Sequence, residues 1–299
     1  YLVENRGLIR GRAAAVLKPA STDQVAAILR LCNAHRIGVV PYGGGTGLVG
    51  GQVCTDGPPP VVLSLERMNR VRAVLPDDGA IIAEAGVILA DLQAAAEAAG
   101  RLFPLSLAAE GTCRIGGNLA TNAGGVQVLR YGNTRDLCLG IEAVLADGSV
   151  LSGLKPLRKD NTGYDLRHLL IGSEGTLGVI TAAALKLFPL PGETVTALLA
   201  VPSPEAALAL LQTLRERLGD GVTAFELIAA QSARFLRQYY PDRPDPLAGD
   251  PEWRVLLEII GPAGAGLTGR AEAALAQVLE SGLATDGAVA ANEAQRTHM

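Results

Sequence analysis

Histidine, cysteine and aromatic residues are scarce in this sequence, and long apolar runs are missing. Three histidines and four cysteines are scattered over 299 residues without a C-x-x-C pair, so neither a zinc site nor a disulfide framework is indicated. Reduced thiols lead us to expect a cytoplasmic protein, either free in solution or peripheral to the inner membrane. Apolar stretches are broken by Glu, Gln, Gly or Pro well before the ~20 residues of a membrane-spanning helix, and no signal peptide is visible.

Clusters of basic residues are also lacking. The formal net charge is −4, and no run of Lys and Arg is long enough to follow a phosphate backbone, so nucleic acid is not an expected partner. The 299 residues, of which 48% are hydrophobic, can bury a large core and are too many for one small domain. Two domains are therefore expected.

Glycine is the residue that the sequence has in excess, and its distribution is uneven. Many of the 36 glycines fall into two groups, in residues 43–51 and residues 111–125, and neither group follows helical periodicity. Glycine leaves the backbone N–H groups accessible and allows positive φ, so we interpret both groups as backbone used for binding. Gly47 in particular is expected to need positive φ, so that valine there would weaken binding.

The first glycine group allows two interpretations. Gly45 to Gly50 matches the dinucleotide fingerprint G-x-G-x-x-G, and Glu66 after the next strand could bind a ribose, as in a Rossmann NAD site. That fingerprint requires a helix that begins at the glycines. Residues 55–60 (TDGPPP) leave no room for a crossover helix before the next strand, because proline removes amide donors. We therefore favour a loop whose N–H groups converge on a pyrophosphate, with a merely flexible turn as the alternative.

The second glycine group is rich in small residues and uncharged hydrogen-bond donors. Such a surface can lie against a flat polar heterocycle such as a flavin, whose edge needs hydrogen bonds from backbone amides or from Asn and Thr side chains. The alternative is a pair of tight turns in an α/β protein.

The polar and apolar pattern predicts helices and strands along the whole chain. A capping box at residues 21–24 predicts a helix that leads into a strand at residues 37–41, and Asp-Gly at residues 147–148 predicts the turn of a hairpin. Pro189 and Pro191 mark a boundary. Beyond it, the pattern predicts a second, separate α/β domain, with strands at residues 195–201, 224–228 and 254–260 and helices at residues 204–218, 229–238 and 267–279.

Four ordered stretches resemble the signatures of one flavoprotein family. They are residues 41–51, 116–125, 158–166 and 172–178, and they are similar to the vanillyl-alcohol oxidase/p-cresol methylhydroxylase superfamily, in its D-2-hydroxyglutarate and D-lactate dehydrogenase-like branch. The resemblance implies an α+β fold, in which residues 1–190 form a two-subdomain FAD-binding domain of the p-cresol methylhydroxylase type. Residues 191–299 would form a partial α/β cap, or substrate domain, that is incomplete at its C-terminus.

The resemblance also implies which residues bind FAD. Gly45 stands where many relatives have Asn, which leaves the backbone cradle intact. Some members attach FAD covalently through His or Cys, but His35, His168 and His298 lie outside the glycine groups, so we expect non-covalent FAD. The implied contacts are Pro41, Gly43, Gly44, Gly45, Thr46, Gly47 and Leu48 around the pyrophosphate; Gly111, Thr112, Gly116, Gly117, Thr121, Asn122, Gly124 and Gly125 along the ribityl chain and isoalloxazine; and Glu174, Gly178 and Ile180 by the adenosine.

The activity implied by the resemblance is oxidation of a D-2-hydroxy acid, such as D-lactate or D-2-hydroxyglutarate, to the 2-oxo acid by hydride transfer from C2 to flavin N5. The electron acceptor would be a quinone or an electron-transfer flavoprotein, and a homodimer is one open arrangement. The alternative function is a non-catalytic FAD-carrying electron-transfer subunit of a larger oxidase complex.

Hydride transfer also needs a base and a cation that binds the substrate carboxylate. No convincing pair is identified within the chain, and Arg114, Tyr131 and His168 are the first candidates. In the family these groups come from a C-terminal region with a His-rich metal motif, so we expect them beyond residue 299, together with any divalent metal. Tyr1, which is not an initiator Met, and Met299, inside a helical pattern, look like cut ends.

Overall fold

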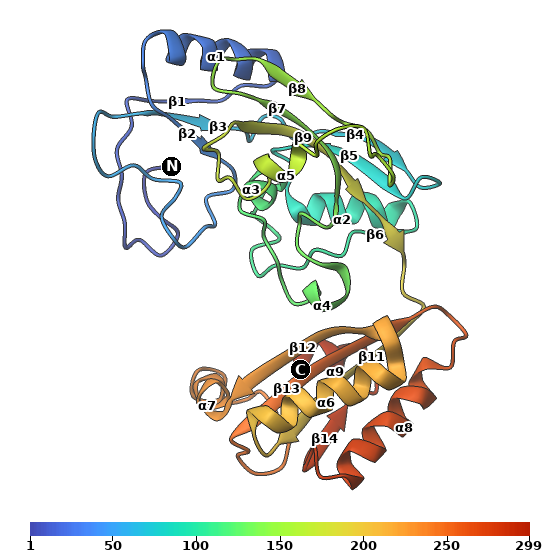
Figure 1. The fold of residues 1–299 in the computed structure, drawn as a ribbon. Helices are drawn as coiled ribbons and strands as arrows, with labels where there is room; N and C mark the ends of the chain where they lie inside the picture. Colours follow the sequence, from blue (N-terminus) through green and yellow to red (C-terminus); the bar gives the residue numbers. More distant parts are fainter. The chain divides into compact units, whose positions relative to one another are not determined.

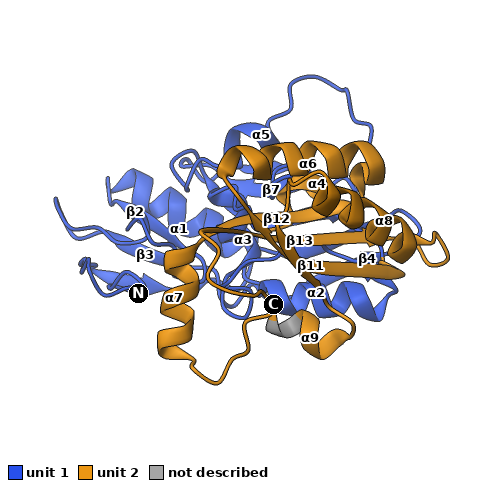
Figure 2. Cartoon of the chain, turned by 90° about the horizontal axis from the view of Figure 1, so that it is seen from below, with its two compact units in different colours: residues 1–125, 132–189 blue, residues 126–131, 190–299 orange. Residues whose placement is uncertain are grey.

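The computed structural model describes residues 1–299, apart from the side chains of Thr297 and His298. His298, one of the histidines considered as a FAD tether, therefore lies outside the described side chains. The chain forms two compact units, shown in Figures 1 and 2: unit 1 is residues 1–125 and 132–189, and unit 2 is residues 126–131 and 190–299. The further division into a FAD-binding domain and a substrate-covering cap stays a prediction.

Unit 1 contains two main sheets. A parallel sheet has the order β1-β3-β2, and a larger antiparallel sheet has the order β4-β5-β9-β7-β8. The strands are β1 (Ala15–Leu17), β2 (Val39–Tyr42), β3 (Val61–Ser64), β4 (Val71–Leu75), β5 (Ala80–Glu84), β7 (Cys138–Val144), β8 (Val150–Ser152) and β9 (Val179–Lys186), with a separate pair β6 (Arg101–Leu102) and β10 (Phe188–Pro189). The helices are α1 (Thr22–Ala34), α2 (Leu89–Ala98), α3 (Ile115–Ala120) and α5 (Arg167–Leu170).

Helix α1 joins β1 to β2 along the chain and packs against strands of both sheets of unit 1 (Figure 1). It begins where the capping box predicts, because Oγ of Ser21 accepts a hydrogen bond from the backbone N–H of Gln24 at 3.3 Å. Its apolar face packs into one core with side chains from β3, β7 and β9; this core includes Val25, Leu29, Leu63, Met68, Val144 and Val179. Val39 of β2 also packs against this core.

The predicted hairpin is confirmed between β7 and β8. Gly148 has φ +79°, and Oδ1 of Asp147 accepts hydrogen bonds from the backbone N–H of Ser149 at 2.8 Å and from its hydroxyl at 2.6 Å. These bonds close the turn locally, which explains why two residues were enough to predict it.

Unit 2 is one antiparallel sheet with the order β12-β13-β11-β14. Its strands are β11 (Glu193–Val201), β12 (Val222–Ala229), β13 (Trp253–Gly261) and β14 (Asp286–Val289), and its helices are α4 (Val128–Tyr131), α6 (Pro204–Leu218), α7 (Ala230–Tyr239), α8 (Leu267–Glu280) and α9 (Glu293–His298), with a short 3₁₀ helix at Gly219–Gly221. The apolar faces of α6 and α8 pack on one side of the sheet and form its core with alternate residues of β11 and β13.

Two features of the fold were not expected from the sequence. The short helix α4 belongs to unit 2, where it packs against β12 and where Nη1 of Arg130 donates a hydrogen bond to the carbonyl oxygen of Ile260 at 3.3 Å. In addition, α3 lies inside the second glycine group, which we had placed outside helical periodicity. With only six residues, two of them glycine, this helix is too short to show a period.

Within the described part of the chain, every helix falls short of the length and apolar character that crossing a bilayer requires.

Candidate functional site

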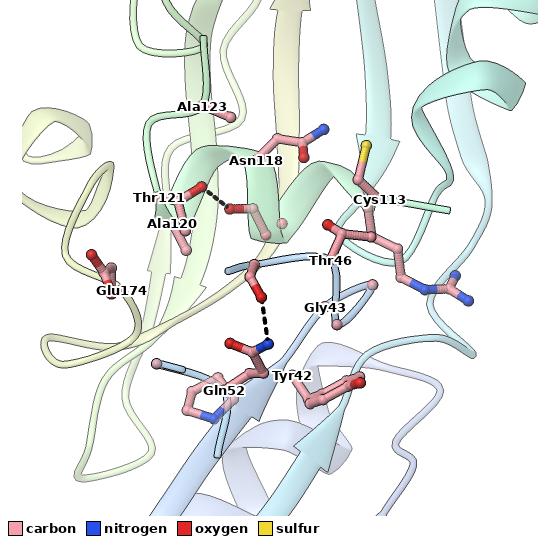
Figure 3. A pocket seen from close by; sticks show the side chains of 18 of the residues that line it. Tyr42, Gly43, Thr46, Gln52, Cys113, Asn118, Ala120, Thr121, Ala123 and Glu174 are labelled. Atoms are coloured by element: carbon pink, nitrogen blue, oxygen red, sulfur yellow. Dashed lines mark hydrogen bonds between the residues drawn. The ribbon is translucent and has the colours of Figure 1, made fainter. Parts of the chain in front are cut away.

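The two glycine groups meet at a cavity of about 350 Å³ in unit 1, shown in Figure 3. One wall is the loop that follows β2, another is the segment around α3, and residues 174–180, which lead into β9, complete it. A volume of this size is in the range of small-molecule and cofactor sites, which is roughly 300–1,000 Å³. Segments that are far apart in the sequence therefore form one site.

Several glycines are required because the two groups touch each other. A Cβ atom on Gly43 would lie 3.2 Å from Cα of Gly117, and a Cβ atom on Gly44 would overlap the carbonyl oxygen of Thr112. A Cβ atom on Gly116 would lie 2.6 Å from Cβ of Ala85 in the strand connection beneath it. Part of the glycine excess that we attributed to ligand binding thus allows backbone to pack closely on backbone.

Positive φ occurs at Gly45 and not at Gly47. Gly45 has φ +70° and Gly50 has φ +80°, whereas Gly47 is absent from the positive-φ residues of the described chain. The expectation of positive φ at Gly47 is therefore wrong, and within the described chain a Cβ atom there would meet only the side chain of Gln52, at 3.3 Å. The expectation that valine at this position weakens binding stays a prediction. In this part of the loop, position 45 is the one whose backbone conformation requires glycine.

Two polar side chains on the cavity wall are hydrogen-bonded to the backbone of the glycine groups. Nε2 of Gln52 donates to the carbonyl oxygen of Gly47 at 2.8 Å, and Oγ1 of Thr121 donates to that of Gly117 at 2.9 Å, as Figure 3 shows. The side chain of Asn118 differs, because it is only 4% exposed and its Nδ2 has no hydrogen-bond partner among the described residues. A buried donor without a partner is costly, so this atom indicates a missing acceptor.

The loop before β9 is bonded to the end of α3. The backbone N–H groups of Gly172 and Glu174 donate to the carbonyl oxygens of Leu119 and Ala120 at 3.0 and 2.9 Å. Glu174 has φ +53° and Asn122 has φ +48°, a conformation that costs a non-glycine residue roughly 1–2 kcal/mol. Strained backbone of this kind often lies at functional sites, where surrounding hydrogen bonds maintain it.

The structure brings most of the expected FAD contacts to this cavity and leaves some outside it. Those on its wall are Pro41, Gly43, Gly44, Gly45, Thr46, Gly47, Gly116, Gly117, Thr121, Glu174, Gly178 and Ile180. Those that do not line it are Leu48, Gly111, Thr112, Asn122, Gly124 and Gly125. Gly125 serves close packing, because a Cβ atom there would overlap the carbonyl oxygen of Ser106, and Oδ1 of Asn122 accepts a hydrogen bond from the backbone N–H of Arg135 at 3.0 Å.

Several residues of the wall were missed. Gln52 and Asn118 stand beside or within the glycine groups, so their amide side chains were a usable signal. Tyr42, Leu65 and Leu107 carry no such signal, since an apolar residue on a cavity wall looks like a core residue in a sequence. The side chains of these residues reach the cavity only because the loops fold together.

Cys113 lies on the wall, inside the second glycine group, although we had expected no His or Cys to be positioned as a FAD tether. Burial raises the pKa of its thiol above the usual 9.0. A thiol with a raised pKa stays protonated at neutral pH and is a weak nucleophile. This supports the expectation of non-covalent FAD, which stays a prediction.

Of the three candidates for base or carboxylate binding, only Arg114 lines the cavity, where its Nη1 also donates to the carbonyl oxygen of Gly86. His168 is off the wall, with Nδ1 3.3 Å from Nη1 of Arg135 and Nε2 3.3 Å from a carboxylate oxygen of Asp165. Tyr131 belongs to unit 2. Among the described side chains no group of three or more His, Cys, Asp or Glu residues could hold a metal ion.

The Rossmann interpretation does not fit this site. The carboxylate of Glu66 contacts Nζ of Lys18 at 2.6 Å and the hydroxyl of Tyr1 at 2.5 Å, and these hydrogen bonds lower its pKa to about 2. Its oxygens are thus already occupied, and no helix begins at the first glycine group in the described chain. By contrast, a cavity walled by glycine, small residues and uncharged donors, with one unpaired buried amide, fits FAD.

Two protein-family models match the chain. Residues 13–153 match the FAD binding domain, and residues 190–299 match the C-terminal domain of FAD linked oxidases.

Curated relatives resemble nearly the whole chain. A mitochondrial D-2-hydroxyglutarate dehydrogenase from Bos taurus is 42% identical over 95% of this chain and 52% of its own length. The corresponding protein from Rattus norvegicus is 40% identical over the same shares. A D-2-hydroxyglutarate–pyruvate transhydrogenase from Saccharomyces cerevisiae is 37% identical over 84% of this chain and 50% of its own length. The chain thus spans about half the length of these relatives.

Solved structures share the fold at lower identity. An alkyldihydroxyacetonephosphate synthase has a TM-score of 0.79 with 20% identity, covering 97% of this chain and 54% of its own. A p-cresol methylhydroxylase with bound substrate has a TM-score of 0.72 with 18% identity, covering 94% and 58%. The expected α+β fold of the p-cresol methylhydroxylase type is confirmed.

The expectation of a cytoplasmic protein is contradicted. The relatives from Bos taurus, Rattus norvegicus and Oryza sativa are all named as mitochondrial proteins. Our expectation had rested on reduced cysteines, which do not specify one compartment.

Proposed function

The chain belongs to the FAD-linked oxidases, and from that premise we propose that it is the flavin-holding part of an oxidoreductase that oxidises a D-2-hydroxy acid, with D-2-hydroxyglutarate as the first substrate to test. The observation that carries the proposal is its 42% identity over 285 residues to the Bos taurus D-2-hydroxyglutarate dehydrogenase, together with the cavity at the predicted motifs. Bound FAD supplies the acceptor for the hydride that leaves C2 of the substrate.

The residues of the cavity would hold the two ends of the cofactor. The backbone of residues 43–47 binds the pyrophosphate through N–H groups, because no side chain of that loop blocks the approach. Residues 116–121 support the ribityl chain and the ring, and residues 174–180 contact the adenosine.

Arg114 is our candidate for the substrate carboxylate. It is the one cationic side chain on the described wall of the cavity, and a guanidinium has five donors, of which the hydrogen bond to Gly86 uses one. A buried carboxylate needs such a partner, because an unpaired buried charge costs several kcal/mol.

A non-catalytic FAD carrier is less well supported. Residues 190–299 match the C-terminal domain of FAD linked oxidases, which a minimal carrier would not need. After the substrate is oxidised, the reduced flavin must pass its electrons on, and we propose a quinone or an electron-transfer flavoprotein as the acceptor. The assembly to test is a homodimer. The Saccharomyces cerevisiae relative, named a transhydrogenase, makes pyruvate a further acceptor worth including.

Anaerobic flavin bleaching tests the oxidation. The chain is loaded with FAD and mixed with D-2-hydroxyglutarate, D-lactate or D-malate, with the L-enantiomers as controls, and the visible flavin absorbance is followed. Because the chain spans about half of its relatives' length, a second version carries the C-terminal half of the Bos taurus relative. We expect bleaching by D-enantiomers only, at least ~100-fold faster in the extended version, the low end of what a positioned acid or base contributes. If neither version is bleached by any D-2-hydroxy acid, the proposal is wrong.

A further inference from the structure

Asn118 is the one residue on the described cavity wall with a buried side-chain donor, Nδ2, that is left without a hydrogen bond. It lies in the middle of α3, and its side chain is visible in Figure 3 between α3 and Cys113. The residue is 4% exposed, and its Nδ2 has no partner. The Cys113 sulfur lies beside this donor, and Asn118 lowers the pKa of that thiol against the larger effect of burial, but sulfur is a weak acceptor and the contact does not have the geometry of a hydrogen bond.

The surroundings of Asn118 indicate which part of FAD would meet it. The cavity wall includes Leu107, Ala109 and Cys113, which are apolar or small and suit a flat ring. The first glycine loop supplies another part of the wall with Thr46 and Gln52, and its backbone N–H groups suit a pyrophosphate. An amide donor beside an apolar wall matches a heterocycle whose face is apolar and whose edge accepts hydrogen bonds.

We propose that Nδ2 of Asn118 donates a hydrogen bond to an acceptor atom on the edge of the isoalloxazine ring, one of N1, O2, O4 and N5. Asn118 is then a positioning residue, and the bound ring satisfies a donor that the folded protein buries in advance. The inference rests on the FAD site and not on the proposed oxidation of a 2-hydroxy acid.

The test measures binding with two probes, FAD and ADP, on the flavin-free 299-residue chain. ADP shares the adenosine and pyrophosphate with FAD and lacks the ring, so it reports on the other end of the site. Asn118→Leu removes the donor and keeps the shape of the side chain. The matched control is Thr196→Val in β11, which removes another buried oxygen without a partner, Oγ1 of Thr196, from a residue that does not line the cavity.

We expect Asn118→Leu to weaken FAD binding about tenfold, as the loss of one hydrogen bond to a ligand does, and to leave ADP binding unchanged. The visible spectrum of bound FAD should also shift, because a hydrogen bond at the ring edge is lost. The melting temperature of the flavin-free protein should not fall, since the variant removes an unsatisfied buried donor. Thr196→Val should change neither dissociation constant.

Two outcomes would overturn the proposal. FAD affinity and spectrum equal to those of the unchanged chain would mean that Asn118 makes no bond to the ring. Equal weakening of FAD and ADP would place its contact at the pyrophosphate or adenosine. If Asn118→Leu fails to fold, Asn118→Ala provides the same comparison. No substrate is present in these measurements, so their result is independent of whether the protein oxidises a 2-hydroxy acid.

Discussion

Two glycines of the first loop differ in what a side chain would do there. Gly45 has φ +70°, and a Cβ atom on it would overlap the hydroxyl of Tyr42, whereas Gly47 meets only the end of the flexible Gln52 side chain. Alanine at residue 45 therefore forces both backbone strain, roughly 1–2 kcal/mol, and a displacement of Tyr42.

We predict that Gly45→Ala weakens FAD binding at least about tenfold and lowers the melting temperature, because strain of this size in the loop is worth a factor of ten. Gly47→Ala, the matched control in the same loop, should change both much less. Fluorescence titration with FAD and thermal unfolding measure the two effects. Similar losses in the two variants would show that the loop needs glycine for some reason other than its backbone conformation.

At the scale of elements, one row of polar side chains crosses the five-stranded sheet of unit 1. Arg72 on β4 contacts the carboxylates of Glu84 on β5 and Glu142 on β7, at 3.3 and 3.1 Å. Oγ1 of Thr181 on β9 donates to Glu142 at 2.9 Å, and Oγ1 of Thr22 in α1 donates to it at 2.6 Å. The row thus joins four strands of this sheet and helix α1, which packs against both sheets.

This row makes stability depend on pH in a defined direction. Burial alone would raise the pKa of Glu84, but hydrogen bonds from the side chain and backbone of Arg70 and from Arg72 outweigh it and hold the pKa below 4.5. Burial alone would also raise the pKa of Glu142. Hydrogen bonds from Arg72, Thr22 and Thr181 outweigh this effect and lower the pKa below 4.5. A carboxyl whose folded pKa is below its unfolded value stabilises the fold above the unfolded pKa, and this contribution disappears as pH falls through the folded pKa.

We therefore predict that the free energy of unfolding decreases on acidification below about pH 4.5, the usual value for these two carboxyls. Urea unfolding between pH 3 and pH 7 measures it. Glu84→Gln should lower stability at pH 7 and reduce the slope in the acidic range, because one of the linked protons is removed. If the free energy of unfolding of Glu84→Gln falls as steeply with pH in the acidic range as that of the unchanged chain, other groups cause the acid sensitivity.

At the scale of the whole molecule, a cofactor bound in unit 1 should stabilise the parts of the chain that form its cavity. FAD at 100 times its dissociation constant should add about 2.7 kcal/mol to the free energy of unfolding, whereas NAD should add nothing, since no helix begins at the first glycine group and Glu66 is engaged by Lys18.

Hydrogen exchange should show where that stabilisation falls. We predict protection by FAD in residues 43–47 and 116–121, measured by mass spectrometry, with little change in β11 and β13 of unit 2. Stabilisation by NAD, or protection confined to unit 2, would contradict the assignment of the cavity.

Local chemistry was sufficient to predict much of this protein. The Ser21 cap, the Asp147-Gly148 turn and the helix at Pro204–Leu218 depend on residues a few positions apart, so their side-chain pattern specifies them. The glycine groups and the absence of a crossover helix favoured a loop that binds a pyrophosphate, and the resemblance to a flavoprotein family in four ordered stretches then implied FAD.

Contacts between distant segments decided what the sequence pattern could not. Which glycines face the ligand and which pack on backbone depends on the approach of Gly44 to Thr112 and of Gly125 to Ser106. The helix around Asn118 carries too few residues for a period, and the backbone N–H of Gly116 is held by the carbonyl oxygen of Ala85, at 2.7 Å, thirty-one positions earlier in the sequence. Burial of one unpaired amide is a property of that tertiary arrangement, because a side chain loses its water only when other segments surround it.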